Sequence, residues 1–190
     1  MKKNFDNNLD ALRHTASHIL AQSVKRLYPD TKLGIGPAIE DGFYYDFFRK
    51  EPFTPDDLEK ITDEMEKIIK EDLKIERFEC DKNKAAEIIK DEPFKLEILL
   101  EIPDEKVSFY KQGEFIDLCA GPHVSSTGEV EHFKLMNISS AYWKGSENRE
   151  TLQRIYGVCF TTAEELKEYL KNLEEETKEL DMDKKEDWIW

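Results

Sequence analysis

Apolar residues recur every three to four positions near the start of the chain, which predicts a long helix ending at Tyr28-Pro29. Its apolar stripe consists of Leu9, Leu12, Ala16, Ile19, Leu20, Val24 and Leu27. His14 and His18 are four residues apart, so they lie about 40° apart around this helix and almost opposite the stripe. Two histidines on such a face can simply be exposed to solvent, or they can form one half of a catalytic or metal-binding site.

Shorter apolar runs predict strands in the rest of the chain. Asp41-Gly42 and Gln112-Gly113 each separate two apolar runs, a pattern typical of β-hairpins. Further strands are expected at 74–80, 133–138, 141–144 and 152–160. Gly36-Pro37, before the first hairpin turn, can be simple turn chemistry or a close approach to a ligand.

Helices are predicted between these strands. Thr54-Pro55 is a favourable helix start, and Asp81 and Thr161 or Thr162 can cap two later helices. Residues 93–100 form a further short element of helical character. The order of helices and hairpins predicts an α+β fold with a mainly antiparallel sheet.

A second group of chemically active side chains lies at the end of a predicted strand. Asp117, Cys119 and His123 fall within seven residues, and strand periodicity places Asp117 and Cys119 on one face. Gly121-Pro122 should turn the chain and bring His123 back near Cys119. Cys119 by itself could be a small buried apolar residue. With the histidine pair of the first helix, however, the set becomes His, His, Cys and His.

These four ligands fit more than one chemistry. They could bind Zn²⁺ and activate a water molecule, although four protein ligands tend to form a closed structural site. Alternatively, a histidine could act as general base without a metal. In that metal-free case Cys119 could also attack as a thiolate, if a neighbouring imidazolium lowered its pKa.

Composition narrows the class of protein. The chain has 190 residues, 39% of them hydrophobic, which fits one domain, or one domain with an appendage. The net charge of −14 argues against a free-standing electrostatic binder of nucleic acid. Three cysteines without a disulfide spacing predict reduced thiols and a cytoplasmic location. No signal peptide or membrane-spanning run is recognised, so no membrane partner is expected.

At this point the sequence resembles the editing domain of bacterial threonyl-tRNA synthetase and, more distantly, the alanyl-tRNA editing domains. The resemblance covers roughly residues 9–175 in several ordered blocks. These blocks are Arg13-His14-Thr15-Ala16-Ser17-His18-Ile19-Leu20-Ala21-Gln22, residues 36–46, residues 92–99, residues 117–124, Ala141-Tyr142-Trp143-Lys144-Gly145 and Leu152-Gln153-Arg154-Ile155-Tyr156-Gly157. Several blocks in order are more specific than the histidine pair alone.

The resemblance implies an antiparallel sheet wrapped around a long central helix. It implies hydrolysis of serine wrongly esterified to the 3′-terminal adenosine of threonine tRNA. The implied catalytic residues are His14, His18, Lys95, Asp117, Cys119 and His123. Lys95, otherwise read as a surface lysine, thereby becomes a site residue, and Asp117 becomes the partner of the substrate ammonium group. The alanyl editing domains hold zinc with two ligand pairs that match His14 and His18, and Cys119 and His123, of this sequence. The resemblance to the threonyl branch implies no cofactor. Zinc is kept as the alternative.

The substrate-binding wall is expected at Gly36, Pro37 and Tyr45, unless these residues serve only hairpin packing. Residues 1–161 are predicted to form the editing domain. Residues 162–190, with eleven acidic and five basic side chains, are predicted to form an acidic helix or linker toward a synthetase core. The class II core is absent, so we expect a fragment of a threonine–tRNA ligase or a separate deacylase.

The expected partners are the tRNA(Thr) acceptor end and the remaining synthetase domains. Basic residues that could contact the acceptor end are Arg13, Lys25, Lys134, Lys144, Arg149 and Arg154. Two alternatives differ in class. One is a non-catalytic module that docks tRNA, and the other is a zinc hydrolase that acts on a small molecule with the same four ligands.

Overall fold

The structure is a computed structural model and describes residues 7–186. Its helices are α1 (Asn7–Leu27), α2 (Pro55–Glu71), α3 (Lys82–Ile88), α4 (Pro93–Glu101) and α5 (Ala163–Glu186), with short 3₁₀ turns η1 (Thr127–Glu129) and η2 (Trp143–Gly145). Its strands are β1 (Lys32–Leu33), β2 (Ala38–Ile39), β3 (Gly42–Phe48), β4 (Ile75–Asp81), β5 (Lys106–Gln112), β6 (Phe115–Leu118), β7 (His132–Tyr142) and β8 (Thr151–Phe160).

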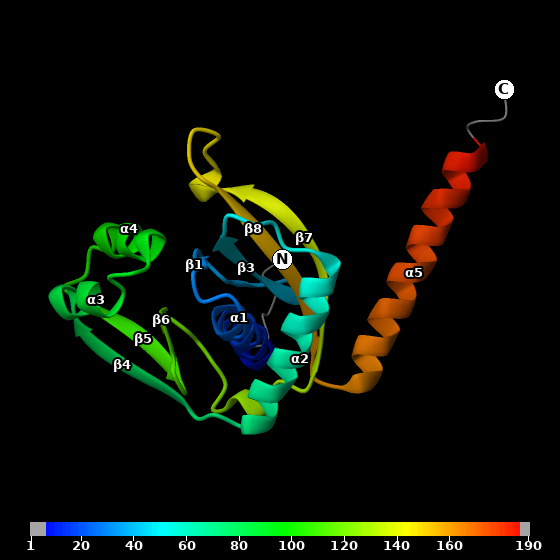
Figure 1. The fold of residues 1–190 in the computed structure, drawn as a ribbon. Helices are drawn as coiled ribbons and strands as arrows, with labels where there is room; N and C mark the ends of the chain where they lie inside the picture. The colour runs from blue at the N-terminus through cyan, green and yellow to red at the C-terminus, as the bar shows by residue number, and fades with distance from the viewer. Residues whose placement is uncertain (1–6, 187–190) are drawn as a thin grey trace, which may run out of the picture.

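The strands form two antiparallel sheets (Figure 1). The larger sheet has the order β1-β3-β8-β7, and the short β2 also pairs with β3 across the turn at Glu40 and Asp41, one residue earlier than predicted. The smaller sheet has the order β4-β5-β6. The predicted α+β class, with a mainly antiparallel sheet, is confirmed.

Helix α1 occupies the centre of the molecule (Figure 1). Its predicted apolar stripe packs into the main core with side chains of α2, β3 and β8, and Ile19, Leu20 and Val24 have no exposed surface. The opposite face is covered as well, which periodicity did not predict. Gln22 on that face is buried and exchanges hydrogen bonds with Gln112 of β5, so hydrogen bonds replace the water expected on a polar helix face.

A second core holds the smaller sheet to α3 and α4 and includes Phe109 and Leu99. A third cluster of Phe94, Trp143 and Leu152 joins α4 to the larger sheet. Helix α4 is therefore fixed from two sides. This anchoring matters because α4 carries Lys95, which points into the interior.

The predicted helix starts are confirmed. Thr54 and Asp57 form a reciprocal capping box at α2, and the Asp81 side chain accepts from the backbone N–H of Lys84 at α3. Thr162, rather than Thr161, accepts from the backbone N–H of Glu165 at α5.

Two predicted strands are in fact one. Residues 133–138 and 141–144 were expected as separate strands, but β7 continues through both until Tyr142. A register shift between Leu135 and Asn137 absorbs one extra residue, so pairing with β8 resumes beyond it. The chain then leaves the sheet at η2, where Lys144 and Gly145 have positive φ.

Helix α5 begins against the sheet, where the Phe160 and Tyr169 rings lie 5.2 Å apart, and then extends away from the body (Figure 1). Of the predicted acidic segment 162–190, residues 187–190 lie outside the described residues. No helix within 7–186 combines the length and the apolar character needed to cross a bilayer.

The core assignment can be tested with two matched truncations. Ile155 in β8 has 0% exposure, whereas Leu100 in α4 is 81% exposed. We expect Ile155→Ala to lower the free energy of unfolding by about 2–5 kcal/mol, because it leaves a cavity. Leu100→Ala should change it by no more than about 0.5 kcal/mol. Urea titration of both variants measures this, and equal effects would contradict the assigned core.

Candidate functional site

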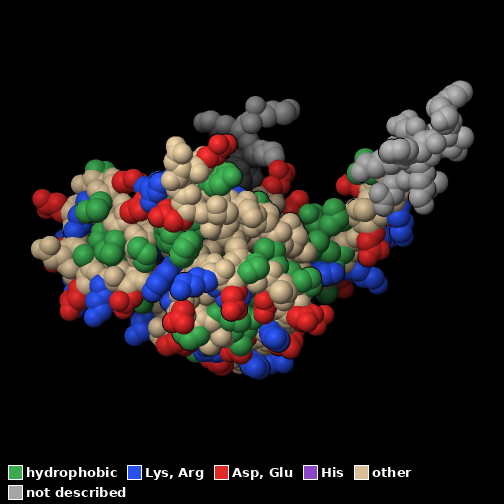
Figure 2. Space-filling model, turned by 45° about the horizontal axis from the view of Figure 1, so that its top comes forward, with side chains coloured by type: hydrophobic (Ala, Val, Ile, Leu, Met, Phe, Trp, Pro, Cys, Tyr) green, Lys and Arg blue, Asp and Glu red, His purple; other side chains and the backbone are tan. Residues whose placement is uncertain are grey.

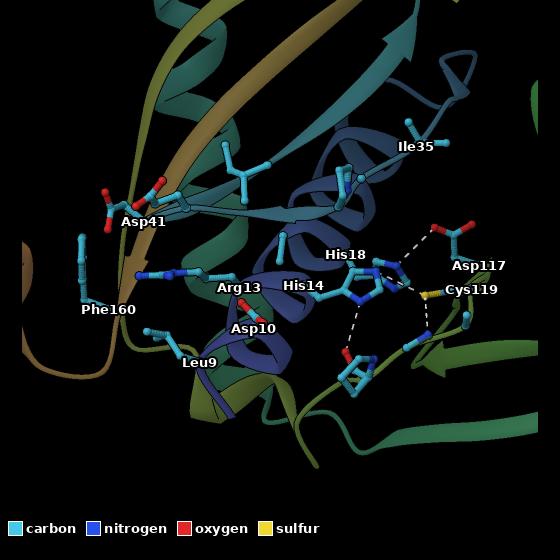
Figure 3. Close-up of a pocket in the computed structure, with 18 of the residues that line it drawn as sticks. Leu9, Asp10, Arg13, His14, His18, Ile35, Asp41, Asp117, Cys119 and Phe160 are labelled. Carbon is cyan, nitrogen blue, oxygen red and sulfur yellow. Dashed lines mark hydrogen bonds and ion pairs between the residues drawn. The ribbon is translucent and has the colours of Figure 1, made fainter. Parts of the chain in front are cut away.

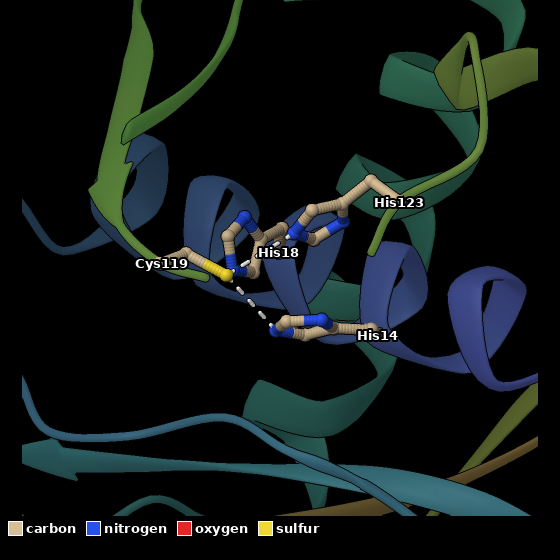
Figure 4. Close-up of side chains that lie close together, drawn as sticks. All are labelled: His14, His18, Cys119 and His123. Carbon is tan, nitrogen blue, oxygen red and sulfur yellow. Dashed lines mark hydrogen bonds between the residues drawn. The ribbon is translucent and has the colours of Figure 1, made fainter. Parts of the chain in front are cut away.

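Two segments more than a hundred residues apart meet at one cysteine. Cys119 follows β6, and its Sγ lies 3.3 Å from Nε2 of His14 and 3.4 Å from Nε2 of His123 (Figure 4). His18, one turn after His14 on α1, completes the group. One ligand atom from each of these four residues lies within 4.8 Å of the others. The His, His, Cys and His set predicted from the sequence is therefore brought together in space.

Backbone groups orient this cluster. Nδ1 of His14 lies 3.1 Å from the carbonyl oxygen of Pro122, and the backbone N–H of Gly121 donates to Cys119 Sγ at 3.2 Å. Gly121 has φ +80, a conformation that favours glycine, and a Cβ there would lie 2.2 Å from the Tyr110 hydroxyl. The predicted turn thus returns His123 to Cys119 and also supplies a donor to the thiol.

Asp117 joins four elements of the fold. Its carboxylate accepts from Lys95 Nζ of α4 at 2.8 Å and from the Tyr45 hydroxyl of β3 at 2.7 Å, and lies 3.4 Å from His18 Nε2 of α1. Asp117 and Lys95 are only 2% and 4% exposed. A charge buried this deeply needs such partners, because an unpaired carboxylate would be strongly destabilising there.

Burial sets the protonation states of the cluster. It lowers the pKa of His14, and it lowers the pKa values of His18 and His123 much further, with help from the neighbouring imidazoles. Burial also raises the pKa of the Cys119 thiol to about 12, against the opposing effect of the Gly121 N–H. At neutral pH the histidines are neutral and the thiol is protonated. No imidazolium is present to favour thiolate attack by Cys119, which speaks against that alternative.

The cluster opens into a pocket of about 1350 Å³ (Figure 3). His14, His18, Asp117 and Cys119 lie at one end, and Arg13, Asp41 and Phe160 lie toward the other (Figure 3). Lys95, Gly36 and Pro37 also line it. Five of the six catalytic candidates, all except His123, therefore line the same cavity as the expected turn.

Tyr45, the third residue expected in the substrate-binding wall, lies behind Gly36 and does not line the pocket. Its side chain is fully buried, and its ring stacks on Phe47 at 5.1 Å. A Cβ on Gly36 would lie 2.0 Å from the Tyr45 ring, so glycine is needed for this close approach. Tyr45 therefore contacts the site through its hydroxyl on Asp117 and through its ring, whose centroid lies 5.4 Å from Lys95 Nζ.

One contact at the site was missed from the sequence. The Thr15 hydroxyl lies 3.0 Å from Nδ1 of His123 and also accepts from the backbone N–H of Val124. Thr15 sits about 100° around α1 from His14, so spacing alone gave no signal. Only the return of the 119–124 loop brings it beside the cluster.

Most of the basic residues named as RNA contacts already have internal partners. Arg13 donates to the Cys159 carbonyl, Lys25 pairs with Glu92, and Arg154 makes two bonds to Asp46. Lys144 and Arg149 both pair with Glu97. Acidic and basic side chains are interspersed over the face seen in Figure 2. These pairs leave fewer cations for phosphate contact, in keeping with the net charge of −14, which argued against a free-standing electrostatic binder of nucleic acid.

The four ligands would also fit a zinc ion. Tetrahedral zinc with ordinary Zn–S and Zn–N bonds separates its ligand atoms by about 3.5 Å. The two Sγ–Nε2 distances of 3.3 and 3.4 Å are close to that value, and they equally suit hydrogen bonds to sulfur. The geometry alone is compatible with a bound zinc ion and with a metal-free, hydrogen-bonded cluster.

Sequence comparisons relate this site to known proteins. Residues 107–156 match the family described as "Threonyl and Alanyl tRNA synthetase second additional domain". Threonine–tRNA ligase of Acetivibrio thermocellus is 57% identical over 172 residues, covering 89% of this chain and 27% of the ligase. The enzymes of Clostridium tetani and Caldanaerobacter subterraneus are 57% and 58% identical over 86% and 87% of the chain, and 26% of each ligase is covered.

The chain is a relative of threonine–tRNA ligases. The resemblance inferred from the sequence is therefore confirmed. The chain spans about a quarter of the length of the curated ligases it matches. The matched family range includes Asp117, Cys119 and His123, whereas α1 and Lys95 lie outside it.

The buried Lys95–Asp117 pair should contribute strongly to stability. Lys95→Met leaves the buried carboxylate without its cation, so the free energy of unfolding should fall by about 3–5 kcal/mol. Lys84→Met, which breaks an exposed pair with Glu87, should lower it far less, because solvent screens an exposed ion pair. Denaturant titration of the two variants compares them directly. Equal losses would show that Lys95 is not the partner that compensates Asp117.

The neutral histidines should make the fold sensitive to mild acid. Burial holds the folded pKa values of His14, His18 and His123 below the ordinary value of 6.5, so below that pH the unfolded chain binds more protons. Stability should therefore be lost as pH falls from 6.5 to 5, by up to about 1.4 kcal/mol per pH unit for each histidine. His18→Gln should flatten this slope in urea titrations; an unchanged slope would contradict burial of a neutral His18.

Proposed function

We propose that this chain hydrolyses the ester of serine wrongly attached to the 3′-terminal adenosine of tRNA(Thr). The observation that carries the proposal is the shared pocket, which presents a neutral imidazole, a buried carboxylate and an ammonium group together. Its volume of about 1350 Å³ leaves room for an aminoacylated nucleoside, whereas a free amino acid would occupy only part of it. The relationship to threonine–tRNA ligases supports the RNA substrate.

Asp117 is proposed to bind the substrate ammonium group. A carboxylate offers about four lone-pair positions. Lys95 and Tyr45 take two of those on Asp117, and His18 Nε2 lies 3.4 Å away. Because Asp117 also lines the pocket, its remaining acceptor position is proposed to take the amine there. Binding the amine there would place the adjoining ester carbonyl close to Lys95 and His14.

His14 is proposed as the general base. Because burial lowers its pKa, its imidazole is unprotonated at neutral pH and can take a proton from water. The water oxygen then forms a bond to the ester carbon, and Lys95 stabilises the charge that develops on the carbonyl oxygen. When the bond to the ribose oxygen breaks, that oxygen receives the proton, and free serine and tRNA are the products.

A metal-free reaction fits this arrangement better than a catalytic zinc. If zinc bound, His14, His18, Cys119 and His123 would hold it, and it would supply Lewis-acid activation of a water molecule. Four protein ligands, however, fill the tetrahedral coordination that zinc prefers and leave no position for that water. We therefore propose hydrolysis without a metal, which should survive exhaustive chelation.

Editing is needed because serine and threonine differ by one methyl group. An active site distinguishes a methyl-sized difference by only about 1–3 kcal/mol, so a synthetase releases some wrong product. A second pocket that admits serine and excludes the extra methyl corrects this. The wall containing Gly36 and Pro37 is proposed to provide that exclusion.

The proposed partners are the acceptor end of tRNA(Thr) and the other domains of a synthetase, in the cytoplasm. Residues 1–161 would form the editing unit, and residues 162–190 would connect it to those domains. Most of the candidate RNA-contacting cations pair with acidic side chains of this chain. The other domains of the synthetase are therefore expected to supply much of the binding affinity for tRNA.

The decisive test compares two histidine variants. His14→Ala should reduce hydrolysis of seryl-tRNA(Thr) by about 100-fold or more, the usual contribution of a general base. His132→Ala alters a histidine on β7 that lies outside the cluster and should leave the rate unchanged. Loss of the radiolabelled serine ester is followed for both variants. The same assay with threonyl-tRNA(Thr) should show slower hydrolysis.

An unchanged rate in His14→Ala would remove His14 from the reaction. Retention of the ester by the wild-type chain, despite measured binding of the tRNA, would instead favour a docking module. Loss of activity on chelation, restored by zinc, would overturn the metal-free form of the proposal.

A further inference from the structure

The Thr15 hydroxyl is surrounded by three partners, although Thr15 is absent from the proposed catalytic set. Thr15 is fully buried on α1, directly after His14. Its Oγ1 lies 2.8 Å from the Ala11 carbonyl oxygen, 3.1 Å from the Val124 backbone nitrogen and 3.0 Å from Nδ1 of His123. A hydroxyl can donate one hydrogen bond and accept two, so these three contacts fill its capacity.

The directions of these bonds follow from the chemistry of the partners. The Ala11 carbonyl oxygen can only accept, so the Thr15 hydroxyl donates its single proton to it. The Val124 N–H can only donate. With its proton already committed, the Thr15 oxygen must accept from His123, and Nδ1 of that ring must therefore carry hydrogen.

The same reasoning applies to His14. Its Nδ1 faces the Pro122 carbonyl oxygen at 3.1 Å, so Nδ1 is the protonated nitrogen there too. Both neutral rings then turn an unprotonated Nε2 toward Cys119 Sγ. A thiol has one hydrogen and can donate to only one of the two nitrogens. The other Nε2 keeps a free lone pair.

We propose that Thr15 is a positioning residue that fixes His123 in the Nδ1–H tautomer, so that His123 Nε2 can accept the thiol hydrogen bond and leave His14 Nε2 free to act as base. Only the catalytic consequence rests on the proposed function. The tautomer assignment stands on the hydrogen-bond geometry around Thr15.

Loss of the hydroxyl should reverse this arrangement. Without an acceptor at Nδ1, the His123 ring gains by moving its proton to Nε2, which then donates toward Cys119 Sγ. The thiol must then donate to His14 Nε2 and occupy the lone pair that the reaction needs. Substrate contacts at Asp117 and Lys95 are untouched, so kcat should fall while KM stays the same.

Three variants separate this role from simple packing. Thr15→Val keeps the size of the side chain and removes the hydroxyl, and Thr15→Ser keeps the hydroxyl. Ser23→Ala is the matched control, because the Ser23 hydroxyl makes the same 2.8 Å bond to the carbonyl four residues earlier on α1. Ser23 is also buried and has no contact with the cluster.

The direct readout is the tautomer of His123, measured by two-bond ¹⁵N–¹H NMR correlations on the chain in the presence of a chelator. The Nδ1–H form is expected in the wild type, Thr15→Ser and Ser23→Ala, and the Nε2–H form should gain population in Thr15→Val. In seryl-tRNA hydrolysis, Thr15→Val should lower kcat about 10-fold or more at unchanged KM, with recovery in Thr15→Ser.

An Nε2–H tautomer in the wild type, or an unchanged tautomer in Thr15→Val, would overturn the proposal. If Thr15→Val does not fold, the wild type and Thr15→Ser still test the assignment, because an Nε2–H tautomer in either would overturn it. The NMR measurement needs no tRNA. A wild-type chain that fails to deacylate seryl-tRNA would therefore refute the proposed function without affecting the tautomer result.

Discussion

The ion pair between Asp117 and Lys95 is the interaction on which the rest of the site depends. With Tyr45 and His18, it ties β6, α4, β3 and α1 to a single carboxylate. Those elements come from separate parts of the chain and belong to different cores. A buried charge tolerates little movement of its partners, because each lost hydrogen bond leaves an uncompensated group. The pair therefore fixes the geometry of a pocket that no single element could define.

Burial of α1 gives the histidines their chemical character. A helix covered on all sides carries His14 and His18 into a region where imidazolium is disfavoured, so the rings stay neutral at physiological pH. The same burial keeps the Cys119 thiol protonated. The cluster is thus arranged as a set of proton acceptors around one sulfur. This suits general-base chemistry at neutral pH, and the same lone pairs could serve a metal.

Much of this could be predicted from the sequence. The His14 and His18 spacing, the hairpin before Cys119 and the turn at Gly121-Pro122 are local features, and local rules place them correctly. The meeting of the two halves was a hypothesis from ligand chemistry that the resemblance strengthened, because no periodicity relates residue 14 to residue 119. The coverage of the polar face of α1 and the hydroxyl of Thr15 beside His123 were not predicted. Both depend on the path of a distant loop, which sequence spacing does not encode.

We propose that Asp117 retains one acceptor position for the amine of the substrate. Calorimetric titration with two stable analogues tests it: 3′-amino-3′-deoxyadenosine carrying serine through an amide, and the same compound with hydroxyl in place of the α-amine. The amine analogue should bind at least about 10-fold more tightly, as expected for a charge-assisted bond of more than about 1.4 kcal/mol. Equal affinity of the two analogues would contradict it.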